Sequence, residues 1–322
     1  MAESVNTVHS LPIREAVAVL KRGGLVAFPT ETVYGLGADA SNPAAVARIY
    51  KVKGRPVNHP VIVHIGDAGQ LERWAREIPQ DARKLAARFW PGPLTLVLGR
   101  ARGVGDYLTG GEDTIGLRMP NHPVALELLR QFGGGIAAPS ANKFGRISPT
   151  TAEHVRNDLG KEIDLILDGG PCEIGIESTI IDLSRDRPIL LRPGRISAEE
   201  IEATLQVETG PRDPSAPRAP GTLESHYAPG HPLKLIPPAR WDETLRAAPL
   251  RRGVLSFRPR PASGAGAMWI EAPSDPVRYA RNLYASLRAL DASGCDEIAV
   301  EEPPASAEWA AVRDRLLRAR SA

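Results

Sequence analysis

The sequence predicts an α/β protein built in two parts, and three observations lead to this class. Short apolar runs alternate with amphipathic stretches over the first two hundred residues. A segment rich in proline and glycine follows, and the same alternation resumes after it. The length of 322 residues suits about two domains at ~150 residues each. We therefore expect a larger domain at residues 1–209, a linker at 210–232 and a small C-terminal α/β domain at 233–322.

In the first part, the apolar runs have the length of buried strands, and the stretches between several of them show helical spacing. The predicted strands are residues 25–28, 61–63, 94–98, 114–117, 136–138, 165–167, 179–181 and 189–191. The predicted helices are residues 13–21, 43–51, 80–88, 123–131, 151–158 and 197–205. Some neighbouring strands leave no room for a helix between them, so we expect a sheet of mixed strand direction.

The segment 210–232 interrupts this pattern because nine of its 23 residues are glycine or proline. Proline fixes φ and lacks an N–H group, which excludes a packed helix or a central strand. After the segment, the pattern predicts strands at 233–236, 253–257, 268–270 and 298–300 and helices at 275–290 and 305–320.

Composition excludes several classes of protein. With 40 basic and 38 acidic residues the net charge is +2, which disfavours a strongly basic nucleic-acid binder but leaves room for a local basic groove. A content of 42% hydrophobic and 24% charged residues is typical of globular proteins and excludes bulk disorder. The two cysteines, Cys172 and Cys295, exclude a disulfide scaffold and a four-cysteine metal site.

The N-terminal segment carries an early acidic residue and no long apolar core, so it does not read as a signal peptide. No run approaches the ~18 apolar residues of a membrane span. We therefore expect a cytoplasmic protein without membrane association.

The common nucleotide and hydrolase signatures are missing. Gly160-Lys161 is followed by Glu162 and is not preceded by P-loop spacing. Residues 35–40 superficially fit a dinucleotide fingerprint, but residues 30–34 intervene after the preceding strand, and the region some 20 residues further on is basic. Neither an HExxH nor a GxSxG motif occurs, which disfavours a zinc protease and an α/β-hydrolase.

Polar side chains instead follow several predicted strands. After residues 25–28 come Thr30, Glu31, Thr32 and Tyr34, and the glycines beyond them let a ligand approach the backbone. A capped turn into the next helix would show the same residues. The sequence alone leaves both interpretations open here.

In two places, polar residues lie two positions apart in the sequence. These pairs are Lys53 with Arg55 and Ser140 with Asn142. An extended chain presents both members of such a pair on one side. Two cations held between prolines suit a polyphosphate, although a solvated basic turn is the alternative. His64 lies within an apolar strand, where a histidine is more often a core residue than a ligand.

Two further predicted strands end in an arginine, Arg118 in one and Arg192 in the other. Ser178 and Thr179 add hydroxyl groups near a third strand. Arg118 has an apolar context and needs an anionic partner, which is either a structural acid or a substrate carboxylate. Strand ends of open α/β sheets are the usual place of ligand binding. No cluster of acids suggests a metal cage, so any Mg²⁺ would arrive with a nucleotide and keep its waters.

A set of motifs then makes the chain resemble a known family. The motifs are FPTETVYGLG (28–37), KGRP (53–56), PVIVHI (60–65), WPGPLTLVL (90–98), RMP (118–120), APSAN (138–142), ESTIID (177–182), LLRPG (190–194) and HYAP (226–229). In this order they resemble the threonylcarbamoyl-AMP synthase family in its long form. The resemblance implies a YrdC-type twisted mixed-sheet catalytic domain plus a smaller Rossmann-like α/β C-terminal domain.

The resemblance also implies a reaction. The family joins L-threonine, bicarbonate or CO2 and ATP into L-threonylcarbamoyladenylate and releases pyrophosphate, with Mg²⁺ accompanying the ATP. The product serves the N6-threonylcarbamoyladenosine modification of tRNA and passes to a separate tRNA threonylcarbamoyl transferase complex. Weak binding of tRNA by this chain is compatible with that role.

The resemblance assigns roles residue by residue. A catalytic signature would consist of Lys53, Arg55, Ser140 and Asn142. The L-threonine pocket would be lined by Thr32, His64, Arg118, Ala138 and Ser178. The ATP contacts would come from Arg55, His59, Thr114, Ser140, Ser148, Arg192 and Tyr227. Within the linker, stiffness from Pro211, Pro214, Pro217 and Pro220 followed by His226-Tyr227 predicts a cover for the active site.

Two other functions compete with this one. The chain would be an RNA-binding YrdC-like module if its main partner were tRNA, but the near-neutral charge disfavours tight binding. A carbamoyl-adenylate synthase that uses carbamoyl phosphate is the other alternative. Proteins of that kind carry cysteine-rich zinc modules and an acylphosphatase domain, and this sequence shows neither.

Overall fold

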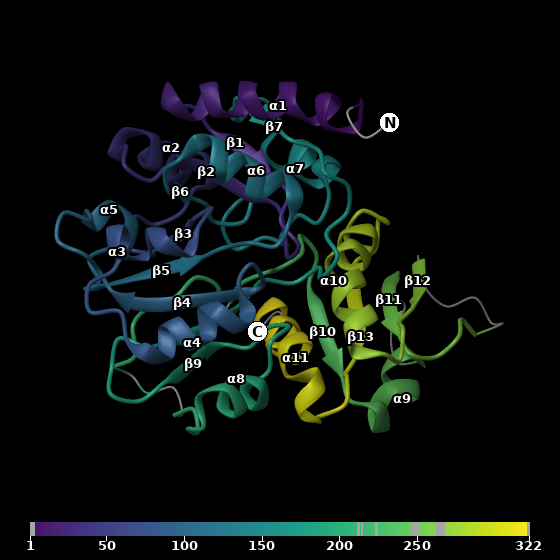
Figure 1. The fold of residues 1–322 in the computed structure, drawn as a ribbon. Helices are drawn as coiled ribbons and strands as arrows, with labels where there is room; N and C mark the ends of the chain where they lie inside the picture. Colours follow the sequence, from purple (N-terminus) through teal and green to yellow (C-terminus); the bar gives the residue numbers. More distant parts are fainter. Residues whose placement is uncertain are drawn as a thin grey trace.

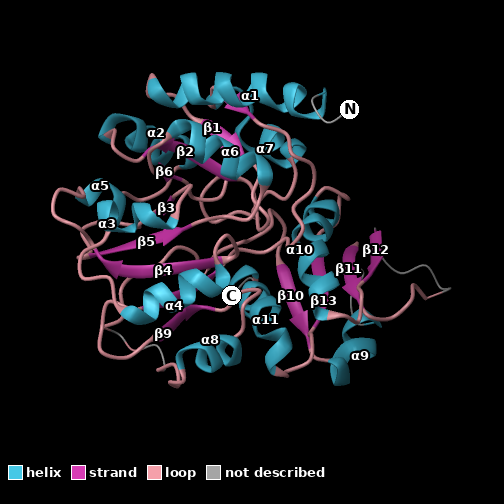
Figure 2. Ribbon diagram, in the orientation of Figure 1, coloured by secondary structure: helices cyan, strands magenta, loops and turns pink. Residues whose placement is uncertain are grey.

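The computed structural model describes residues 4–210, 213, 215–222, 225–246, 251–261 and 268–320. Two sheets organise these residues, one with nine strands in the first part of the chain and one with four strands in the C-terminal part. Figures 1 and 2 show the sheets beside each other, with the C-terminal helix α11 (Ala310–Ala319) between them. The predicted α/β class with two sheets is confirmed.

The larger sheet has the strand order β7-β1-β2-β6-β3-β5-β4-β8-β9. Its strands are β1 (Val26–Phe28), β2 (Gly35–Asp39), β3 (Ile62–His64), β4 (Leu94–Gly99), β5 (Thr114–Arg118), β6 (Ile136–Ala137), β7 (Leu165–Ile166), β8 (Thr179–Asp182) and β9 (Ile189–Arg192). β3 pairs with β5 in parallel, whereas β4 pairs with β5 antiparallel. The mixed strand direction expected from the short connections is confirmed.

Strand β2 was not predicted, because its sequence GLGAD reads as a glycine-rich turn. The strand pairs antiparallel with β1 and β6, so it lies inside the sheet. A Cβ atom on Gly37 would lie 2.8 Å from Ile136 Cγ2 and 2.9 Å from Phe28 Cε1. Glycine at this position lets neighbouring side chains pack closely. The same glycines are typical of turns, so the local sequence did not predict a strand.

Helices cover the larger sheet on both faces (Figure 1). They are α1 (Ser4–Lys21), α2 (Pro43–Lys53), α3 (Leu71–Trp74), α4 (Gln80–Phe89), α5 (Asp106–Thr109), α6 (Pro123–Phe132), α7 (Ala152–Leu159) and α8 (Ala198–Leu205). The packing of α1 on α6 buries Leu20 and Leu128 against Phe28 of the sheet. α1 begins at Ser4 rather than at residue 13 and continues through Pro12. The short helices α3 and α5 were not predicted.

The end of α2 changes the interpretation of the first pair of cations. α2 continues through Lys53 and ends at Gly54, whose φ of 64° lies in the left-handed region. Lys53 therefore belongs to the last helical turn, where a cation suits the negative end of the helix dipole. The prediction that Lys53 and Arg55 alternate along an extended chain is wrong.

The smaller sheet has the order β10-β13-β11-β12, and all its neighbouring strands are parallel. Its strands are β10 (Leu233–Ile236), β11 (Arg252–Ser256), β12 (Met268–Glu271) and β13 (Glu297–Glu301). Its helices are α9 (Trp241–Arg246), which was not predicted, α10 (Pro276–Asp291) and α11. Short 3₁₀ turns lie at Ala68–Gln70, Gly160–Glu162, Pro238–Arg240 and Ala307–Trp309.

The two parts share a hydrophobic core. Val33, Ile147 and Ile176 of the first part belong to the same buried cluster as Leu283 and Tyr284 on α10. Between the sheets, the described linker residues lie along the first part, where Ala228 N donates to Gly145 O at 2.8 Å. Of the prolines expected to stiffen the linker, Pro211 and Pro214 lie outside the described residues. The shared core holds the C-terminal helices close to the strand ends of the larger sheet.

In the part of the chain that the structure describes, no helix has the length and hydrophobicity of a membrane span.

Candidate active site

A cavity lies where the ends of β3, β5 and β9 meet the loops that follow β1 and β6. Its lining residues come from several of the sequence motifs and from the linker. They are Thr30, Thr32, Val33, Gly35, Arg55, Ile62, His64, Arg118, Ala138, Pro139, Ser140, Glu177, Ser178, Arg192, Pro220, Gly221, His226 and Tyr227. The linker residues form part of its lining, and the space of about 50 Å³ has room for a few waters. Most of the residues that the sequence predicted for a site line this one cavity.

Some predicted site residues lie outside the lining. They are Lys53, His59, Thr114, Asn142 and Ser148. Thr114 lines a small adjoining cavity together with Thr95 and Pro220. Lys53, Asn142 and Ser148 are buried and contact protein groups instead.

Arg118 has an acidic protein partner. Its Nη2 lies 2.7 Å from Glu31 Oε1, and its Nη1 donates to Thr32 Oγ1 at 2.9 Å. Both side chains of the ion pair are almost fully buried, at 5% and 4% exposure. Of the two partners that the sequence left open, the structure pairs the guanidinium with a protein acid, and Glu31 was not among the predicted site residues. Its place in the motif next to Thr30 and Thr32 was the signal available.

His64 is buried on β3 and has an Nδ1 atom without a hydrogen-bond partner among the described residues. Burial, with the nearby charge of Arg118, lowers the pKa of His64 to about 3. The imidazole is therefore neutral at neutral pH. A neutral ring with an open nitrogen in a cavity wall is available to a substrate group.

Lys53 and Asn142 hold the loop that follows β6. Lys53 Nζ donates to the carbonyl oxygens of Ser140 and Asn142. Asn142 Nδ2 donates to the carbonyls of Lys143 and Arg146 at 2.9 Å and 2.8 Å. Burial and the neighbouring charge of Arg55 lower the pKa of Lys53 well below its usual value. These contacts fix the position of Ser140, which lines the cavity.

Arg55 lines the cavity on the same side. Its Nη2 donates to the Pro60 carbonyl at 2.7 Å, and its guanidinium lies 5.6 Å from the ring centroid of Phe144. Burial lowers the pKa of Arg55 to about 10, which leaves it charged. The His59 ring packs edge-on against Phe144 at 5.5 Å and lies outside the cavity lining.

Ser178 lies between two polar neighbours at the start of β8. Its Oγ lies 2.8 Å from Thr95 Oγ1 and accepts a hydrogen bond from Arg192 Nη2 at 3.1 Å. Arg192 Nη1 also donates to the Pro220 carbonyl of the linker at 2.9 Å. Arg192 thus connects the cavity wall to the linker.

The linker contributes Tyr227, whose hydroxyl is buried and has no hydrogen-bond partner among the described residues. Gly221 faces this hydroxyl closely, because a Cβ atom on Gly221 would lie 1.9 Å from it. Gly221 also has a φ of 75°, in the left-handed region. His226 packs edge-on against Tyr227, and burial lowers the pKa of His226 to about 3.

Acidic groups near the cavity are already engaged. Glu31 pairs with Arg118, and Glu177 accepts hydrogen bonds from Ser148 at 2.6 Å and Tyr284 at 2.9 Å. Within the described ranges, no three His, Cys, Asp or Glu side chains form a group that fits a metal ion. The donor set of this cavity therefore does not fit a resident metal.

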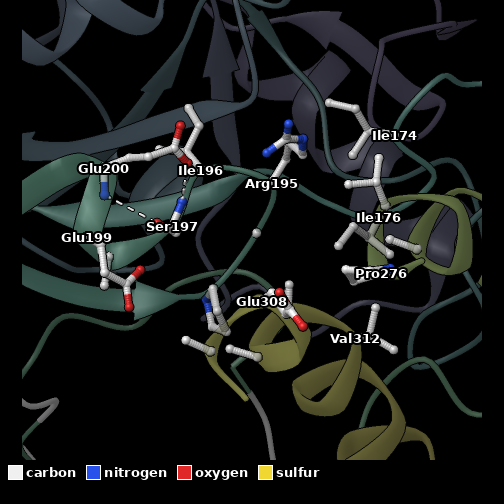
Figure 3. Close-up of a pocket in the computed structure, with 18 of the residues that line it drawn as sticks. Ile174, Ile176, Arg195, Ile196, Ser197, Glu199, Glu200, Pro276, Glu308 and Val312 are labelled. Atoms are coloured by element: carbon white, nitrogen blue, oxygen red, sulfur yellow. Dashed lines mark hydrogen bonds between the residues drawn. The ribbon is translucent and has the colours of Figure 1, made fainter. Parts of the chain in front are cut away.

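A second cavity, of about 260 Å³, lies between the two parts of the chain (Figure 3). Figure 3 shows Ile174, Ile176, Pro276 and Val312 on one side of it, with Ser197 and Glu200 joined by hydrogen bonds on the other. Its lining is mainly apolar and includes none of the site residues predicted from the sequence. We therefore take the first cavity as the candidate active site.

Two family models together match almost the whole chain. One, of the Sua5, YciO and YrdC group and described as telomere recombination, matches residues 18–194. The other, described as the threonylcarbamoyl-AMP synthase C-terminal domain, matches residues 196–321.

Curated relatives agree with these models. The threonylcarbamoyl-AMP synthase of Pyrococcus abyssi is 42% identical over 329 residues, covering 97% of this chain and 95% of that protein. The threonylcarbamoyl-AMP synthase of Bacillus subtilis is 42% identical over 320 residues, covering 95% and 92%. A shorter relative, the putative threonylcarbamoyl-AMP synthase of Mycobacterium tuberculosis, is 44% identical over 200 residues, covering 62% of this chain and 92% of that protein.

A solved structure has the same fold over nearly the same length. The crystal structure of P. abyssi Sua5 complexed with L-threonine has a TM-score of 0.88 at 41% identity. The match covers 95% of this chain and 93% of the P. abyssi chain.

Proposed function

Because the chain belongs to the Sua5-type threonylcarbamoyl-AMP synthase family, we propose that the cavity under the linker is where it joins L-threonine, CO2 or bicarbonate and ATP. The chain is an enzyme of this family, and its matches extend over both sheets.

The proposed reaction has two steps. The amine of L-threonine attacks CO2 and loses a proton, which gives an N-carboxylate. An oxygen of this carboxylate then attacks the α-phosphorus of ATP, the bond from that phosphorus to the bridging oxygen of the β-phosphate breaks, and pyrophosphate leaves. The protein has to hold two anions against each other and to neutralise the charge that develops at phosphorus.

We assign the threonine side of the cavity to the wall formed by Thr32, His64, Arg118, Ala138 and Ser178. Arg118 would bind the α-carboxylate, because a guanidinium offers two parallel donors to a carboxylate. Its ion pair with Glu31, at 2.7 Å, would hold the guanidinium in place for this contact. The neutral His64 would offer its open ring nitrogen to the amino or hydroxyl group of threonine.

We assign the ATP side to Arg55, Ser140 and Arg192, with Tyr227 above them and Thr114 in the adjoining cavity. The charged guanidinium groups of Arg55 and Arg192 would neutralise phosphate oxygens. Ser148, His59, Lys53 and Asn142 would support this side without lining the cavity, and Lys53 and Asn142 do so by holding the Ser140 loop.

Mg²⁺ would arrive with the triphosphate. Glu31 and Glu177 are engaged in protein contacts, so the wall leaves the ion to be held by phosphate oxygens and water. No step of the proposal depends on a protein ligand to the metal.

The product is a mixed anhydride, which water destroys, so a closed cavity protects it. The linker residues Pro220, Gly221, His226 and Tyr227 line this cavity and would act as its cover, moving to admit ATP. We propose that the product then passes to a separate transferase that modifies tRNA.

One observation carries the proposal: Arg118, suited to an amino-acid carboxylate, lies in the same cavity as Arg55, Ser140 and Arg192, suited to a triphosphate. The test is pyrophosphate release by the purified protein with each substrate omitted in turn. Release is expected only with ATP, L-threonine and bicarbonate together, and the nucleotide product should be an acyl-AMP that decays to AMP. Equal release without threonine would replace this function by plain ATP hydrolysis or by the use of carbamoyl phosphate.

A further inference from the structure

Four polar side chains connect the C-terminal domain to the wall of the active site, and we call them the Glu177 cluster: Ser148, Glu177, Tyr284 and Arg315. Arg315 lies on α11, and its side chain is 0% exposed. Its Nε donates to Glu177 Oε2 at 2.7 Å, and its Nη1 donates to the Pro193 carbonyl at 3.0 Å. A charged side chain of the second domain thus ends beside a residue that lines the cavity.

Each oxygen of the Glu177 carboxylate has an assigned partner. Oε1 accepts from Ser148 Oγ at 2.6 Å, and Oε2 accepts from the Tyr284 hydroxyl at 2.9 Å and from Arg315. Burial by itself would raise the pKa of Glu177, but the charges of Arg315 and Arg192 and these hydrogen bonds lower it to about 2. Glu177 is therefore a fixed anion, oriented from both domains.

Arg315 also reaches two other segments that build the site. Its guanidinium lies 5.4 Å from the ring centroid of Tyr227 in the linker, and the Pro193 carbonyl that it binds directly follows Arg192. Ser178, the neighbour of Glu177, carries the hydroxyl that Arg192 and Thr95 hold in the cavity wall. One side chain thus contacts three segments around the cavity.

Interface stability alone does not account for this arrangement. A buried ion pair contributes little net stability compared with apolar packing, because desolvation offsets the attraction. On the same face of α11, about one turn from Arg315, Val312 borders the cavity of Figure 3, so apolar packing between the domains is incomplete there. The interface places its most deeply buried charges beside the active site.

We propose that Arg315 is a positioning residue for the ATP side of the active site, acting through Glu177 on the Ser148 hydroxyl and through the Pro193 carbonyl on the neighbouring Arg192. The inference rests on the function proposed above and deepens it, because it gives the C-terminal domain a part in the reaction. Arg315 touches no substrate in this scheme.

The test compares Arg315→Met with the wild-type chain in the pyrophosphate-release assay. Methionine keeps much of the length of arginine but removes the hydrogen bonds to Glu177 and Pro193. We expect kcat to fall on the order of 10- to 100-fold, as for misplaced reacting groups. The KM for ATP should rise, whereas the KM for threonine should stay within about twofold, because Arg118 and Thr32 keep their contacts.

Arg252→Met is the matched control. Arg252 forms a buried ion pair with Glu297 inside the C-terminal domain, with side chains 7% and 5% exposed. Among the described residues, its other hydrogen bonds go to the carbonyls of Thr244 and Leu245 in the same domain. Both variants should lower the unfolding temperature, but only Arg315→Met should change kcat and the KM for ATP. An equal kinetic loss in both variants would reduce Arg315 to a structural role and overturn the proposal.

Two gentler variants keep the test decisive if Arg315→Met does not fold. Tyr284→Phe removes only the hydroxyl that donates to Glu177, and Arg315→Lys keeps the charge. We expect Tyr284→Phe to change kcat and the KM for ATP less than Arg315→Met does. Arg315→Lys should restore both parameters in part. Wild-type kinetics in both folded variants would contradict the inference. The absence of threonine-dependent release in the wild-type chain would instead contradict the proposed function itself.

Discussion

Single residues in the cavity wall combine buried cations with neutral histidines. Arg118 is balanced by Glu31, whereas His64 loses its charge through burial and through the same arginine. Both effects follow from the cost of placing an unpaired charge in a low dielectric. At this scale, the chemistry of the site depends on which charges have partners.

Arg118→Lys tests the threonine subsite. Lysine keeps the positive charge but loses the planar pair of donors that matches a carboxylate. We expect the KM for threonine to rise about 10-fold or more, with the KM for ATP changed less than about twofold. Steady-state kinetics with each substrate varied in turn measure both values. A rise in the KM for ATP instead would move Arg118 to the other subsite.

The buried histidines predict how stability depends on pH. His64 and His226 have folded pKa values of about 3, below the ordinary value of 6.5, so the unfolded chain binds more protons between these values. Their contribution is complete above pH 6.5 and declines as the pH falls, by up to about 1.4 kcal/mol per unit for each residue.

Urea unfolding at about pH 7.5 and about pH 5.5 measures this effect. The free energy of unfolding should be lower at the acidic pH, and His64→Asn should show a smaller difference than the wild-type chain. An unchanged difference in His64→Asn would mean that His64 is protonated in the folded protein.

At the scale of elements, the proposed role of the linker as a cover depends on Tyr227, which lines the cavity. Tyr227→Ala removes the buried ring that stacks on Tyr284 at 5.8 Å and lies over Arg315. We expect a lower kcat and a shorter lifetime of the acyl-AMP product, because water would reach the anhydride. Product lifetime is measured by following AMP formation after the substrates are exhausted.

Limited proteolysis gives an independent readout for the same element. Cleavage within 210–232 should slow when ATP and threonine are added together, since bound substrates would hold the cover closed. Equal cleavage rates with and without substrates, together with a normal product lifetime in Tyr227→Ala, would leave the segment as a plain connection.

Strand β2 depends on a glycine for packing. A methyl group at Gly37 would meet Ile136 Cγ2 at 2.8 Å and Phe28 Cε1 at 2.9 Å, so Gly37→Ala should lower the free energy of unfolding by roughly 1–3 kcal/mol. Gly116→Ala in β5 is the control, because its nearest contact would be an ordinary 3.4 Å. Chemical denaturation compares the two. Equal losses would show that backbone preference, not crowding, makes the glycine necessary.

At the scale of the whole molecule, buried contacts join the two domains. The core cluster shared by Ile147, Ile176 and Tyr284 and the Glu177 cluster both cross the boundary. The relative from Mycobacterium tuberculosis aligns over 92% of its own length but covers only 62% of this chain, so it is too short to hold both domains. A protein of this kind can therefore exist without the second domain, although in this chain the first domain has built contacts to it.

Truncation after residue 209 tests this dependence. The fragment is expected to fold but to unfold at a lower temperature than the full chain, because Val33, Ile147 and Ile176 lose their covering helix. Its activity should be low, since Glu177 loses Arg315 and the linker is absent. Circular dichroism melts and the pyrophosphate assay measure both. Full activity of the fragment would contradict the roles of the linker and the C-terminal domain together.

Local patterns in the sequence were sufficient for most of the secondary structure. Buried strands such as 94–99 and amphipathic helices such as 276–291 have the expected periods, because each buries one apolar face or run. The motif residues at strand ends converge on one cavity, as the topology of open α/β sheets favours. The sequence by itself therefore determined the class of fold, the family and half of the residues that line the cavity.

Only the tertiary structure decided the partners of the buried charges. That Arg118 pairs with Glu31, that Lys53 holds the Ser140 loop and that Arg315 reaches Glu177 depends on contacts between segments far apart in the chain. The same is true of β2, where close packing across the sheet overrides the turn preference of glycine. The local sequence shows the periodicity of a helix or strand. Desolvation and close packing act between elements, so the partners of buried charges and the conformation of β2 are fixed only once the chain is folded.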